Sequence, residues 1–315
     1  MFITAIIPNY NHAPYLQERL ESVLQQDRQP DEVIILDDCS TDNSVAIIEA
    51  FIAAHPTVQF VRNTVNSGST FAQWQKGIAI AKGDYIWMAE SDDVAAPGLL
   101  AALADRIITQ PTAVLAYCQS ERMNSLGVIT GSWLDYTASL PDSSVFNTSF
   151  LMDGTRYLQQ FLIHRNTIPN ASAVLFSKKA FEQVGGVPKG FTTNGDWLLW
   201  IRFALVGAIA YVNTPYNKFR YHDSSVIAKA HAATSNAYKE RYDYTMRMQL
   251  VPFLQGQALA PIKKINNYYI GLDMGQKGLH CLQLRQWLKG WYWVIKGSVY
   301  GGFKTGFIKK AIGII

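Results

Sequence analysis

The first hundred residues alternate between short apolar runs and stretches whose apolar side chains recur at helical spacing. The apolar runs have strand length and are bounded by turn residues, which predicts strands at 3–7, 32–36, 58–61 and 84–89. The periodic stretches predict helices at 15–26, 43–54 and 71–81. Strands alternating with helices are typical of βαβ units. The pattern therefore predicts an α/β fold with a Rossmann-like, mostly parallel sheet flanked by helices.

The pattern weakens in the middle of the chain. A helix is predicted at 99–108 and a strand at 113–118, but the segment 119–166 is rich in Ser, Asn and Gly, with one predicted helix at 154–164. A strand, two helices and a strand then follow at 171–177, 178–186, 195–207 and 208–212. Beyond Ser225 the chain becomes helical, aromatic and basic. We therefore expect two parts, residues 1–225 and a helical C-terminal region, residues 226–315.

An acidic cluster, Glu90-Ser91-Asp92-Asp93, stands directly after the fourth predicted strand. Polar residues also end the first two strands, at 8–11 and at Asp37-Asp38, and such ends share the ligand-binding edge of a parallel sheet. Clustered carboxylates repel each other unless a cation or donors offset them, and Mg²⁺ or Mn²⁺ bridges carboxylates to phosphates. This predicts a metal–nucleotide site, with Tyr10 stacking on the base. The alternative, that Asp92 and Asp93 cap the helix after Pro97, stays open.

Charge is distributed unevenly along the chain. The net charge is +4, yet seven basic and no acidic residues follow Asp273, so residues 1–273 carry about −3. The three cysteines lack metal-ligand spacing, which is typical of a reduced, intracellular protein. The N-terminus lacks a basic leader, and the longest apolar stretch, 203–212, is shorter than the roughly 20 residues that span a bilayer. We therefore expect a cytoplasmic protein without a transmembrane helix.

The segment "IIPNYNHAPYLQERLESVLQQDRQPDEVIILDDCSTDNS", followed by the acidic cluster and a proline, resembles the family 2 glycosyltransferases of the GT-A fold, of the bacterial surface-polysaccharide type. The resemblance covers about residues 3–225. It implies that the first loop and the end of the second strand hold the nucleotide of a nucleotide-sugar. Pro8 and Tyr10 would line the base, and Asp38 would accept from a ring N–H, which favours uracil or thymine. The implied binding positions in this part of the chain are Pro8, Tyr10, Asn11, Asp38, Asn66 and Gly68.

The family's D-x-D motif stands here as Glu90-Ser91-Asp92, with Glu in place of the usual Asp. The resemblance implies that Asp92 binds Mn²⁺ or Mg²⁺, that Glu90 faces the ribose or a metal-bound water, and that all three residues belong to the donor site. His222, in "FRYHDSS", would be a further metal or diphosphate ligand, with Arg220 and Ser224 near the phosphates. A purely structural role for His222 is equally open.

A general base is implied at Asp196 in "NGDWLLWIRFA", with Gly195 where relatives often carry a second acid. Partial burial before an apolar helix would raise the pKa of Asp196 towards a useful range. The alternative is that Asp196 only caps this helix. Many relatives also carry a donor-binding Arg in the helix at 71–81, where this chain offers Gln73, Gln75 and Lys76 instead.

The implied function is a metal-dependent, inverting transfer of a sugar from a UDP- or dTDP-sugar to a hydroxyl of a glycan acceptor, by a single displacement. A nucleotidyltransferase would carry a Gly-rich, basic phosphate loop after the first strand, and "PNYNHAPY" is not one. The rival from another class is a non-catalytic nucleotide- or glycan-binding, membrane-associated module with a decayed site, which Glu90 and Gly195 favour.

The C-terminal tail combines basic and aromatic residues. In a helical projection of 284–296, Arg285, Lys289 and Lys296 share one side, and apolar side chains spread over the other. This favours a helix in the membrane interface, which suits a polyprenyl-linked acceptor and a peripheral location on the inner face of the membrane. A helix that docks on the catalytic domain is the plain alternative. Such residues also serve nucleic-acid binding, although we expect no nucleic-acid partner.

Overall fold

The computed structural model describes residues 1–168, 170–188, 190–191, 194–222, 242–302 and 308. The chain divides into two compact units, residues 1–225 and 226–315. Ser224, implied to lie near the phosphates, falls outside the described residues.

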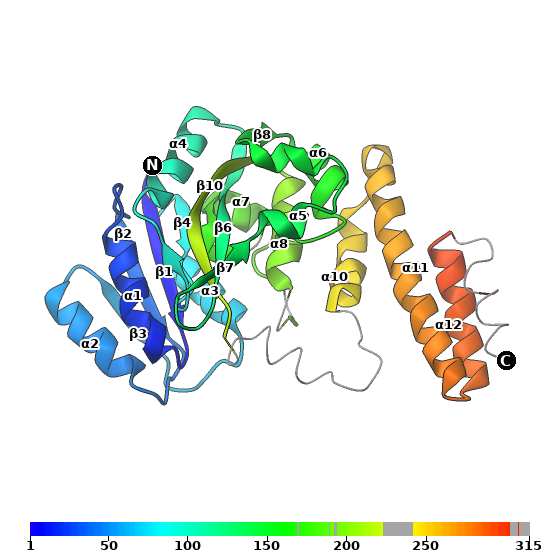
Figure 1. Cartoon of the computed structure of the whole chain (residues 1–315), viewed down its shortest axis with the longest axis horizontal. Coiled ribbons are helices and arrows are strands. Elements are labelled where there is room, and N and C mark those ends of the chain that lie inside the picture. The colour runs from blue at the N-terminus through cyan, green and yellow to red at the C-terminus, as the bar shows by residue number, and fades with distance from the viewer. Residues whose placement is uncertain (169, 189, 192–193, 223–241, 303–307, 309–315) are drawn as a thin grey trace. The chain divides into compact units, whose positions relative to one another are not determined.

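One mixed sheet organises the first unit, in the order β3-β2-β1-β4-β9-β6-β10-β5, with β7 beside β6 and β8 beside β10 (Figure 1). The strands are β1 (Ile3–Asn9), β2 (Glu32–Asp37), β3 (Gln59–Arg62), β4 (Tyr85–Met88), β5 (Val94–Ala95), β6 (Ala113–Met123), β7 (Ile129–Ser132), β8 (Phe150–Met152), β9 (Val174–Ser177) and β10 (Ala208–Arg220). The first four strands pair in parallel, as predicted. The carboxyl ends of β1, β2 and β4 therefore meet at one edge.

Beyond β4 the prediction of a mostly parallel sheet needs correction. β9 lies antiparallel between β4 and β6, and β10 returns parallel to β6. β5, β7 and β8 also pair antiparallel. An apolar run reports that a strand is buried, whereas its direction depends on how the preceding chain travels. The apolar run at 171–177 therefore predicted a buried strand, but it could not predict that this strand runs antiparallel to its neighbours.

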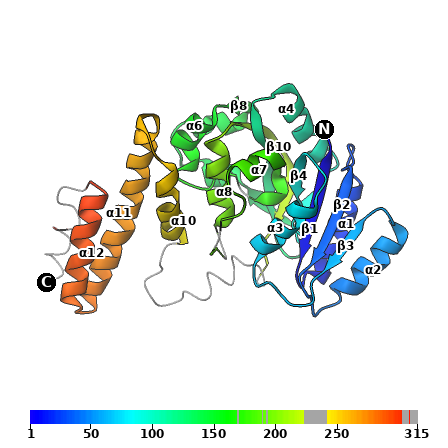
Figure 2. The ribbon, with the colours of Figure 1, turned by 180° about the vertical axis from the view of Figure 1, so that it is seen from behind.

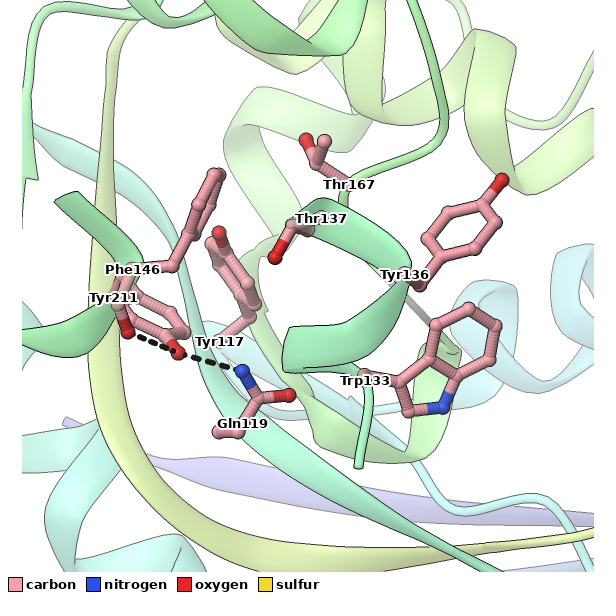
Figure 3. A pocket seen from close by; sticks show the side chains of 8 residues that line it. All are labelled: Tyr117, Gln119, Trp133, Tyr136, Thr137, Phe146, Thr167 and Tyr211. Carbon is pink, nitrogen blue, oxygen red and sulfur yellow. Dashed lines mark hydrogen bonds between the residues drawn. The ribbon is translucent and has the colours of Figure 1, made fainter. Parts of the chain in front are cut away.

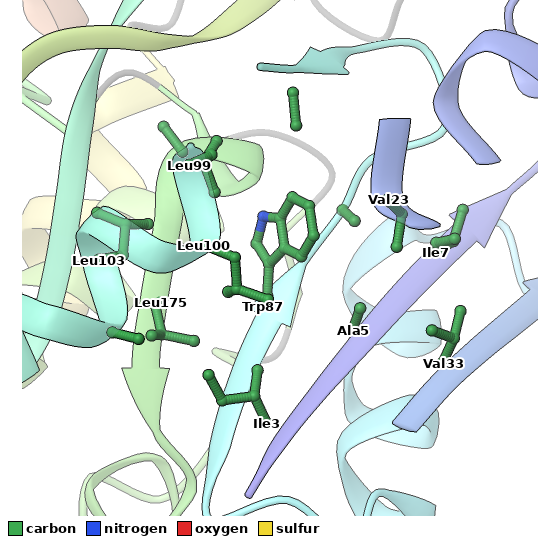
Figure 4. Packing of buried hydrophobic residues seen from close by; sticks show 14 of the residues in the cluster. Ile3, Ala5, Ile7, Val23, Val33, Trp87, Leu99, Leu100, Leu103 and Leu175 are labelled. Carbon is green, nitrogen blue, oxygen red and sulfur yellow. The ribbon is translucent and has the colours of Figure 1, made fainter. Parts of the chain in front are cut away.

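Helices cover both faces of the sheet (Figure 1 and Figure 2). They are α1 (Ala13–Leu24), α2 (Ser44–Ala54), α3 (Thr70–Ile80), α4 (Leu99–Thr109), α5 (Leu134–Thr137), α6 (Gly154–Tyr157), α7 (Lys178–Gln183) and α8 (Gly195–Ala204). Side chains alternate across a strand, so Ile3, Ala5 and Ile7 of β1 join one core with α1 and α4, while Ile6 faces α3. Figure 4 shows Trp87 of β4 between β1 and the leucines of α4.

The middle of the chain is less regular than predicted. The helix expected at 154–164 is α6 followed by a π-helical stretch, η2 (Leu158–Leu162). A 3₁₀ turn, η1 (Ser143–Asn147), precedes β8, and another, η3 (Ala171–Ala173), opens the strand expected at 171–177. The strand expected at 208–212 continues to Arg220. This extension stays paired with β6 and brings Arg220 next to the acidic cluster.

The second unit contains α10 (Tyr242–Leu250), α11 (Ala260–Gln283) and α12 (Trp287–Tyr300), with 3₁₀ turns η4 (Val251–Phe253) and η5 (Gln257–Leu259). Glycines bring α11 and α12 into close contact, because a Cβ added at Gly271 would lie 2.4 Å from Gly301 Cα. No helix in the described part of the chain is long and apolar enough to cross a membrane.

Candidate active site

A buried polar network ties the ends of β1 and β2 together. Asn9 Nδ2 donates to Asp37 Oδ1 at 2.9 Å, and Asp37 Oδ2 accepts from the Ser40 backbone N–H at 2.9 Å. Asn11 adopts a left-handed conformation, with φ 57°, and its Oδ1 accepts from the Thr41 backbone N–H at 2.8 Å. These bonds hold the first loop to the loop after β2. Asp37 therefore supports the loops rather than a ligand.

The two residues implied to line the base differ in accessibility. Tyr10 is 44% exposed, so its ring is available for stacking. Pro8 is buried within β1, where it pairs with Leu36 of β2. The structure therefore presents Tyr10 at the surface of this edge and places Pro8 in the sheet.

The Asp38 carboxylate organises the loop between β3 and α3. Its Oδ1 accepts from Asn63 Nδ2 at 2.6 Å and from the Ser67 backbone N–H at 2.9 Å, and its Oδ2 accepts from Ser67 Oγ at 2.7 Å. Asn66 Nδ2 donates to the Asp38 carbonyl at 2.9 Å, and Asn66 Oδ1 accepts from the Gly68 N–H at 2.7 Å. Hydrogen bonds thus connect Asp38, directly after β2, to the loop that contains Asn66 and Gly68.

The three residues in place of the family's Arg each bind a protein partner. Gln73 Nε2 donates to Asp38 Oδ1 at 2.8 Å. Gln75 Oε1 accepts from the Val187 backbone N–H at 3.4 Å. Lys76 Nζ donates to Oδ1 of Asn63, the residue that follows β3. Gln73 therefore braces the Asp38 loop, a role that a longer, charged Arg would not fill in the same way.

Two carboxylates of the acidic cluster are fixed by protein donors. Glu90 Oε1 accepts from Trp74 Nε1 at 2.6 Å, and Asp93 Oδ1 accepts from the Arg220 backbone N–H at 3.0 Å. Burial, followed by the charge of Asp92, raises the pKa of Glu90 to about 8 and that of Asp93 to about 7. Three neighbouring carboxylates therefore do not all ionise readily in this environment.

Asp92 turns instead towards two histidines. Asp92 Oδ2 lies 2.9 Å from His222 Nε2, and His12 Nδ1 lies 2.8 Å from Ser91 Oγ. One potential ligand atom from each of His12, Asp92 and His222 lies within 4.8 Å of the other two. Burial alone would raise the pKa of Asp92, but the His222 hydrogen bond and the nearby imidazoles hold this pKa below its ordinary value. The donor set of two imidazoles and a carboxylate fits a divalent cation.

The alternative of a helix cap is wrong for the acidic cluster. The N-cap residue of α4 is Gly98, and the Leu100 backbone N–H in the first turn of α4 donates to Gln26 Oε1 at 2.9 Å rather than to an aspartate of the cluster. Asp93 is bonded to the end of β10, and Asp92 faces His222.

Arg220 braces the acidic cluster and is not placed for phosphate binding. It is 3% exposed, its Nε donates to the Asp92 carbonyl at 2.8 Å, and its Nη2 donates to Glu18 Oε2 at 2.6 Å. The guanidinium also lies 4.8 Å above the Tyr15 ring. The resemblance implied a position near the phosphates, but these bonds occupy the side chain because β10 delivers it into the protein interior.

A second arginine, Arg19 of α1, is completely buried behind the cluster. Its three guanidinium nitrogens have no hydrogen-bond partner within the described residues, and its Cζ lies 5.2 Å from the Trp87 ring centroid. Burial lowers the pKa of Arg19 to about 10, although the charges of Asp93, Asp92 and Glu90 raise it. A positive charge inside the protein therefore offsets part of the negative charge at this edge.

Asp196 lies in the first turn of α8. The N-cap position belongs to Asn194, at φ 59°, so the alternative of Asp196 as N-cap is wrong. Asp196 Oδ2 accepts from Asn166 Nδ2 at 3.1 Å, and burial raises the pKa of this carboxyl. A half-buried carboxylate with a raised pKa has the properties of a general base.

The start of α8 packs against α3. A Cβ added at Gly195 would lie 2.8 Å from the Phe71 ring, so a second acid at this position does not fit the packing. Further along α8, the ring centroids of Trp200 and of Trp74 in α3 are 6.3 Å apart. Trp74 in turn donates a hydrogen bond to Glu90. The helix α3 therefore connects the candidate base to the acidic cluster.

A small aromatic pocket is lined in part by Thr167, the residue that follows Asn166 in the chain (Figure 3). Gln119 Nε2 donates to Tyr211 Oη at 2.9 Å inside it. Its lining residues, most of them from the irregular segment 119–166 and the adjoining strands, are Tyr117, Gln119, Trp133, Tyr136, Thr137, Phe146, Thr167 and Tyr211. The cavity that they enclose has a volume of about 10 Å³, which is room for roughly one water molecule and too small for an organic ligand.

Three residues of this site were missed in the sequence. His12 follows the first loop by one position, so its signal was its place in "PNYNHAPY". Trp74 and Arg19 carried no separate signal, because helical periodicity marks an inward face without showing which polar group it meets.

Known proteins resemble this chain along much of its length. A model of glycosyl transferase family 2 matches residues 4–185. The glycosyltransferase GlyG of Streptococcus pneumoniae is 35% identical over 33% of this chain, but this covers only 35% of GlyG. The putative teichuronic acid biosynthesis glycosyltransferase TuaG of Bacillus subtilis is 26% identical over 76% of this chain and 87% of TuaG. This chain thus spans about a third of GlyG and most of TuaG.

Solved structures share the fold. S. aureus TarS 1–349 in complex with UDP-GlcNAc matches with a TM-score of 0.66 and 17% identity, covering 100% of this chain and 84% of that one. A mannosyltransferase of Pyrobaculum calidifontis in complex with GDP-Man and Mn²⁺ matches with a TM-score of 0.56 and 15% identity, covering 96% of this chain and 88% of that one. Since the family model spans more than half of the chain and the GT-A architecture agrees, this protein belongs to glycosyl transferase family 2.

Proposed function

We propose that this protein is a metal-dependent, inverting glycosyltransferase that moves a sugar from a UDP- or dTDP-sugar to a hydroxyl of a glycan acceptor in surface polysaccharide synthesis. The observation that carries the proposal is the pairing of Asp92 with His222 beside the loops of Tyr10 and Asp38. The ends of parallel strands meet there, which supports the proposal of a cation site next to a nucleotide site.

On the donor side, Tyr10 offers an exposed ring for the base. Asp38 Oδ2 accepts from Ser67 in the described structure, and a carboxylate oxygen has room for a second donor such as a ring N–H. Asn66 and Gly68 shape the loop around it, and Asn11 holds the first loop in place. Pro8, buried in β1, contributes by fixing the start of that loop.

On the phosphate side, Asp92 and His222 hold Mn²⁺ or Mg²⁺ in this proposal. When bound, the cation supplies positive charge opposite the leaving diphosphate. Ser91 orients His12 next to this pair, and Glu90 is bonded to Trp74. In this proposal Glu90 faces the ribose.

On the acceptor side, Asp196 accepts the proton of the attacking hydroxyl. Burial raises the pKa of Asp196, which makes it a stronger base than an ordinary aspartate, and Asn166 orients it. With one base and no positioned nucleophile in the proposal, the hydroxyl attacks the anomeric carbon directly while the bond from that carbon to the diphosphate oxygen breaks. The result is inversion at that carbon.

Calorimetric titration of UDP and dTDP, with Mn²⁺ and then with EDTA, tests the donor side. We expect metal-dependent binding that is lost in Asp92→Asn and retained in Asp105→Asn, an exposed aspartate of α4. Release of UDP or dTDP from a panel of nucleotide-sugars then identifies the donor. Absence of any nucleotide binding would favour the non-catalytic rival in its glycan-binding form.

A membrane surface is the proposed partner of α12. Leu288, Tyr292, Ile295 and Val299 are exposed on one face of α12, whereas Gly290, Val294 and Gly297 are buried on the other. The helical projection of 284–296 put the apolar side chains, Leu288 and Val294 among them, on one side, whereas in the structure Leu288 is exposed and Val294 is buried. Exposed Lys289 and Lys296 complete a surface suited to anionic lipid.

Flotation of the full chain with phosphatidylglycerol vesicles tests this partner. Leu288 is 91% exposed, and Leu288→Glu should weaken binding about tenfold or more, because the loss of one buried leucine costs roughly 1.5–3 kcal/mol. Leu126→Glu changes a leucine of the first unit that is 85% exposed and should bind like the unaltered chain. Equal loss in both variants would contradict a role for α12.

A further inference from the structure

His12 stands in a rigid segment between β1 and α1. The residue before it, Asn11, accepts from the Thr41 backbone N–H at 2.8 Å. The residue after it, Ala13, donates its backbone N–H to Asp42 Oδ2 at 2.9 Å. Both neighbours are thus tied to the loop after β2. The His12 backbone is therefore held in place without any ligand.

The His12 ring is oriented towards the Asp92–His222 pair. Its Nδ1 lies 2.8 Å from Ser91 Oγ, which fixes the plane of the ring. The ring centroids of His12 and His222 are 5.3 Å apart at an interplanar angle of 85°. One potential ligand atom from each of the three side chains lies within 4.8 Å of the others. A hydrogen bond to one ring nitrogen is also how proteins orient a metal-binding histidine.

The other carboxylates of the cluster are turned away from this group. Glu90 is bonded to Trp74, and Asp93 is bonded to the backbone of Arg220. The group that the structure assembles therefore contains two imidazoles and one carboxylate. Two of the three potential ligand atoms in this group are therefore imidazole nitrogens, although Glu90-Ser91-Asp92-Asp93 is acidic in sequence.

We propose that His12 is a third protein ligand of the cation and that it makes the site selective for cations that favour imidazole. This inference rests on the proposed metal site. Imidazole nitrogen suits first-row transition metals, whereas Mg²⁺ prefers oxygen ligands and water, and affinity rises from Mn²⁺ to Co²⁺. The site should accordingly bind Co²⁺ more tightly than Mn²⁺, and Mn²⁺ more tightly than Mg²⁺.

Metal titration of the full chain tests the role of His12 without relying on activity. Co²⁺ binding is measured by calorimetry and by visible absorption, Mn²⁺ by electron paramagnetic resonance, and Mg²⁺ by competition with Co²⁺, each with and without UDP. We expect His12→Asn to weaken Co²⁺ binding about 10–100-fold and Mg²⁺ binding far less. Asparagine also suits the N-cap position that His12 occupies, so the helix should be retained.

Two further variants make the result specific. His55→Asn alters an exposed histidine at the end of α2 and should leave metal binding unchanged. Ser91→Ala removes the hydrogen bond that orients the His12 ring and should weaken Co²⁺ binding less than His12→Asn does.

The outcomes separate this inference from the proposed function. Loss of Co²⁺ binding in Asp92→Asn with unchanged binding in His12→Asn would overturn the role of His12 and leave the proposed metal site intact. Equal weakening of Co²⁺ and Mg²⁺ in His12→Asn would also overturn the selectivity. Absence of metal binding in the unaltered chain, with or without UDP, would overturn both proposals.

Discussion

The acidic cluster, in the loop after β4, and Asp196, in the first turn of α8, are both carboxylate sites of the first unit, but they are stabilised differently. The cluster lies among compensating groups: Arg19 and Arg220 nearby, a bond from Trp74 to Glu90, and histidines beside Asp92. Asp196 has one side-chain amide, from Asn166, in the described structure. Burial raises the pKa of Asp196, and within the described residues hydrogen bonds, rather than a cation, oppose this shift.

This difference in surroundings suits the two carboxylates to different roles, cation binding for Asp92 and proton acceptance for Asp196. A carboxylate that is to hold a cation has to stay ionised, and the histidines keep the pKa of Asp92 low. A carboxylate that is to accept a proton benefits from a raised pKa, and the apolar start of α8 provides it. The environment, rather than the residue type, assigns the two roles.

The sharpest test of this division is Asp196→Asn. In the proposed mechanism, the loss of the base should lower kcat about 10²–10⁴-fold and leave metal-dependent UDP binding intact. UDP release and calorimetry on the same preparation measure the two effects. Asp105→Asn serves as the exposed control. A parallel loss of UDP binding would place Asp196 on the donor side instead.

The compensation around the cluster is tested by Arg220→Gln. Shortening this buried side chain removes its bonds to the Asp92 carbonyl and to Glu18, so the free energy of unfolding should fall by about 2–4 kcal/mol. Urea denaturation measures the change. Arg156→Gln, on the exposed surface of α6, should cost less than about 0.5 kcal/mol. Similar costs in the two variants would show that Arg220 is not a brace.

The crowding at the start of α8 is tested by Gly195→Ala. The added Cβ would meet the Phe71 ring, so the free energy of unfolding should fall by about 1–3 kcal/mol. Phe71→Leu in the same chain should recover part of this loss, and a double-mutant cycle measures the coupling. Strict additivity of the two changes would contradict the contact.

The smallest effect is the pH dependence of stability due to Asp196. Because its folded pKa is raised, the native state holds this proton more tightly than the unfolded chain does. The free energy of unfolding should therefore fall as pH rises from about 4, the ordinary pKa of Asp, through the raised folded value. Asp196→Asn should lack this fall. The difference between the two chains in urea denaturation across this range isolates it, and a constant difference would argue against the raised pKa.

The sequence by itself determined much of the first unit. Strands β1 to β4, helices α1 to α4 and the acidic cluster at the end of β4 were predicted within a few residues, because periodicity and turn residues are local properties of the chain. The family resemblance rested on the same segment and was confirmed. The roles of the individual site residues stay proposals.

Only the tertiary structure decided which polar side chains lie close enough to interact. The direction of β9, the burial of Arg19 and the meeting of His12 with Asp92 and His222 join segments that are distant in the sequence. The pocket lined from 119–166 arises in the same way, since that segment has little periodicity of its own. Local patterns predict which side chains face inward, whereas a site depends on long-range packing, which no single segment encodes.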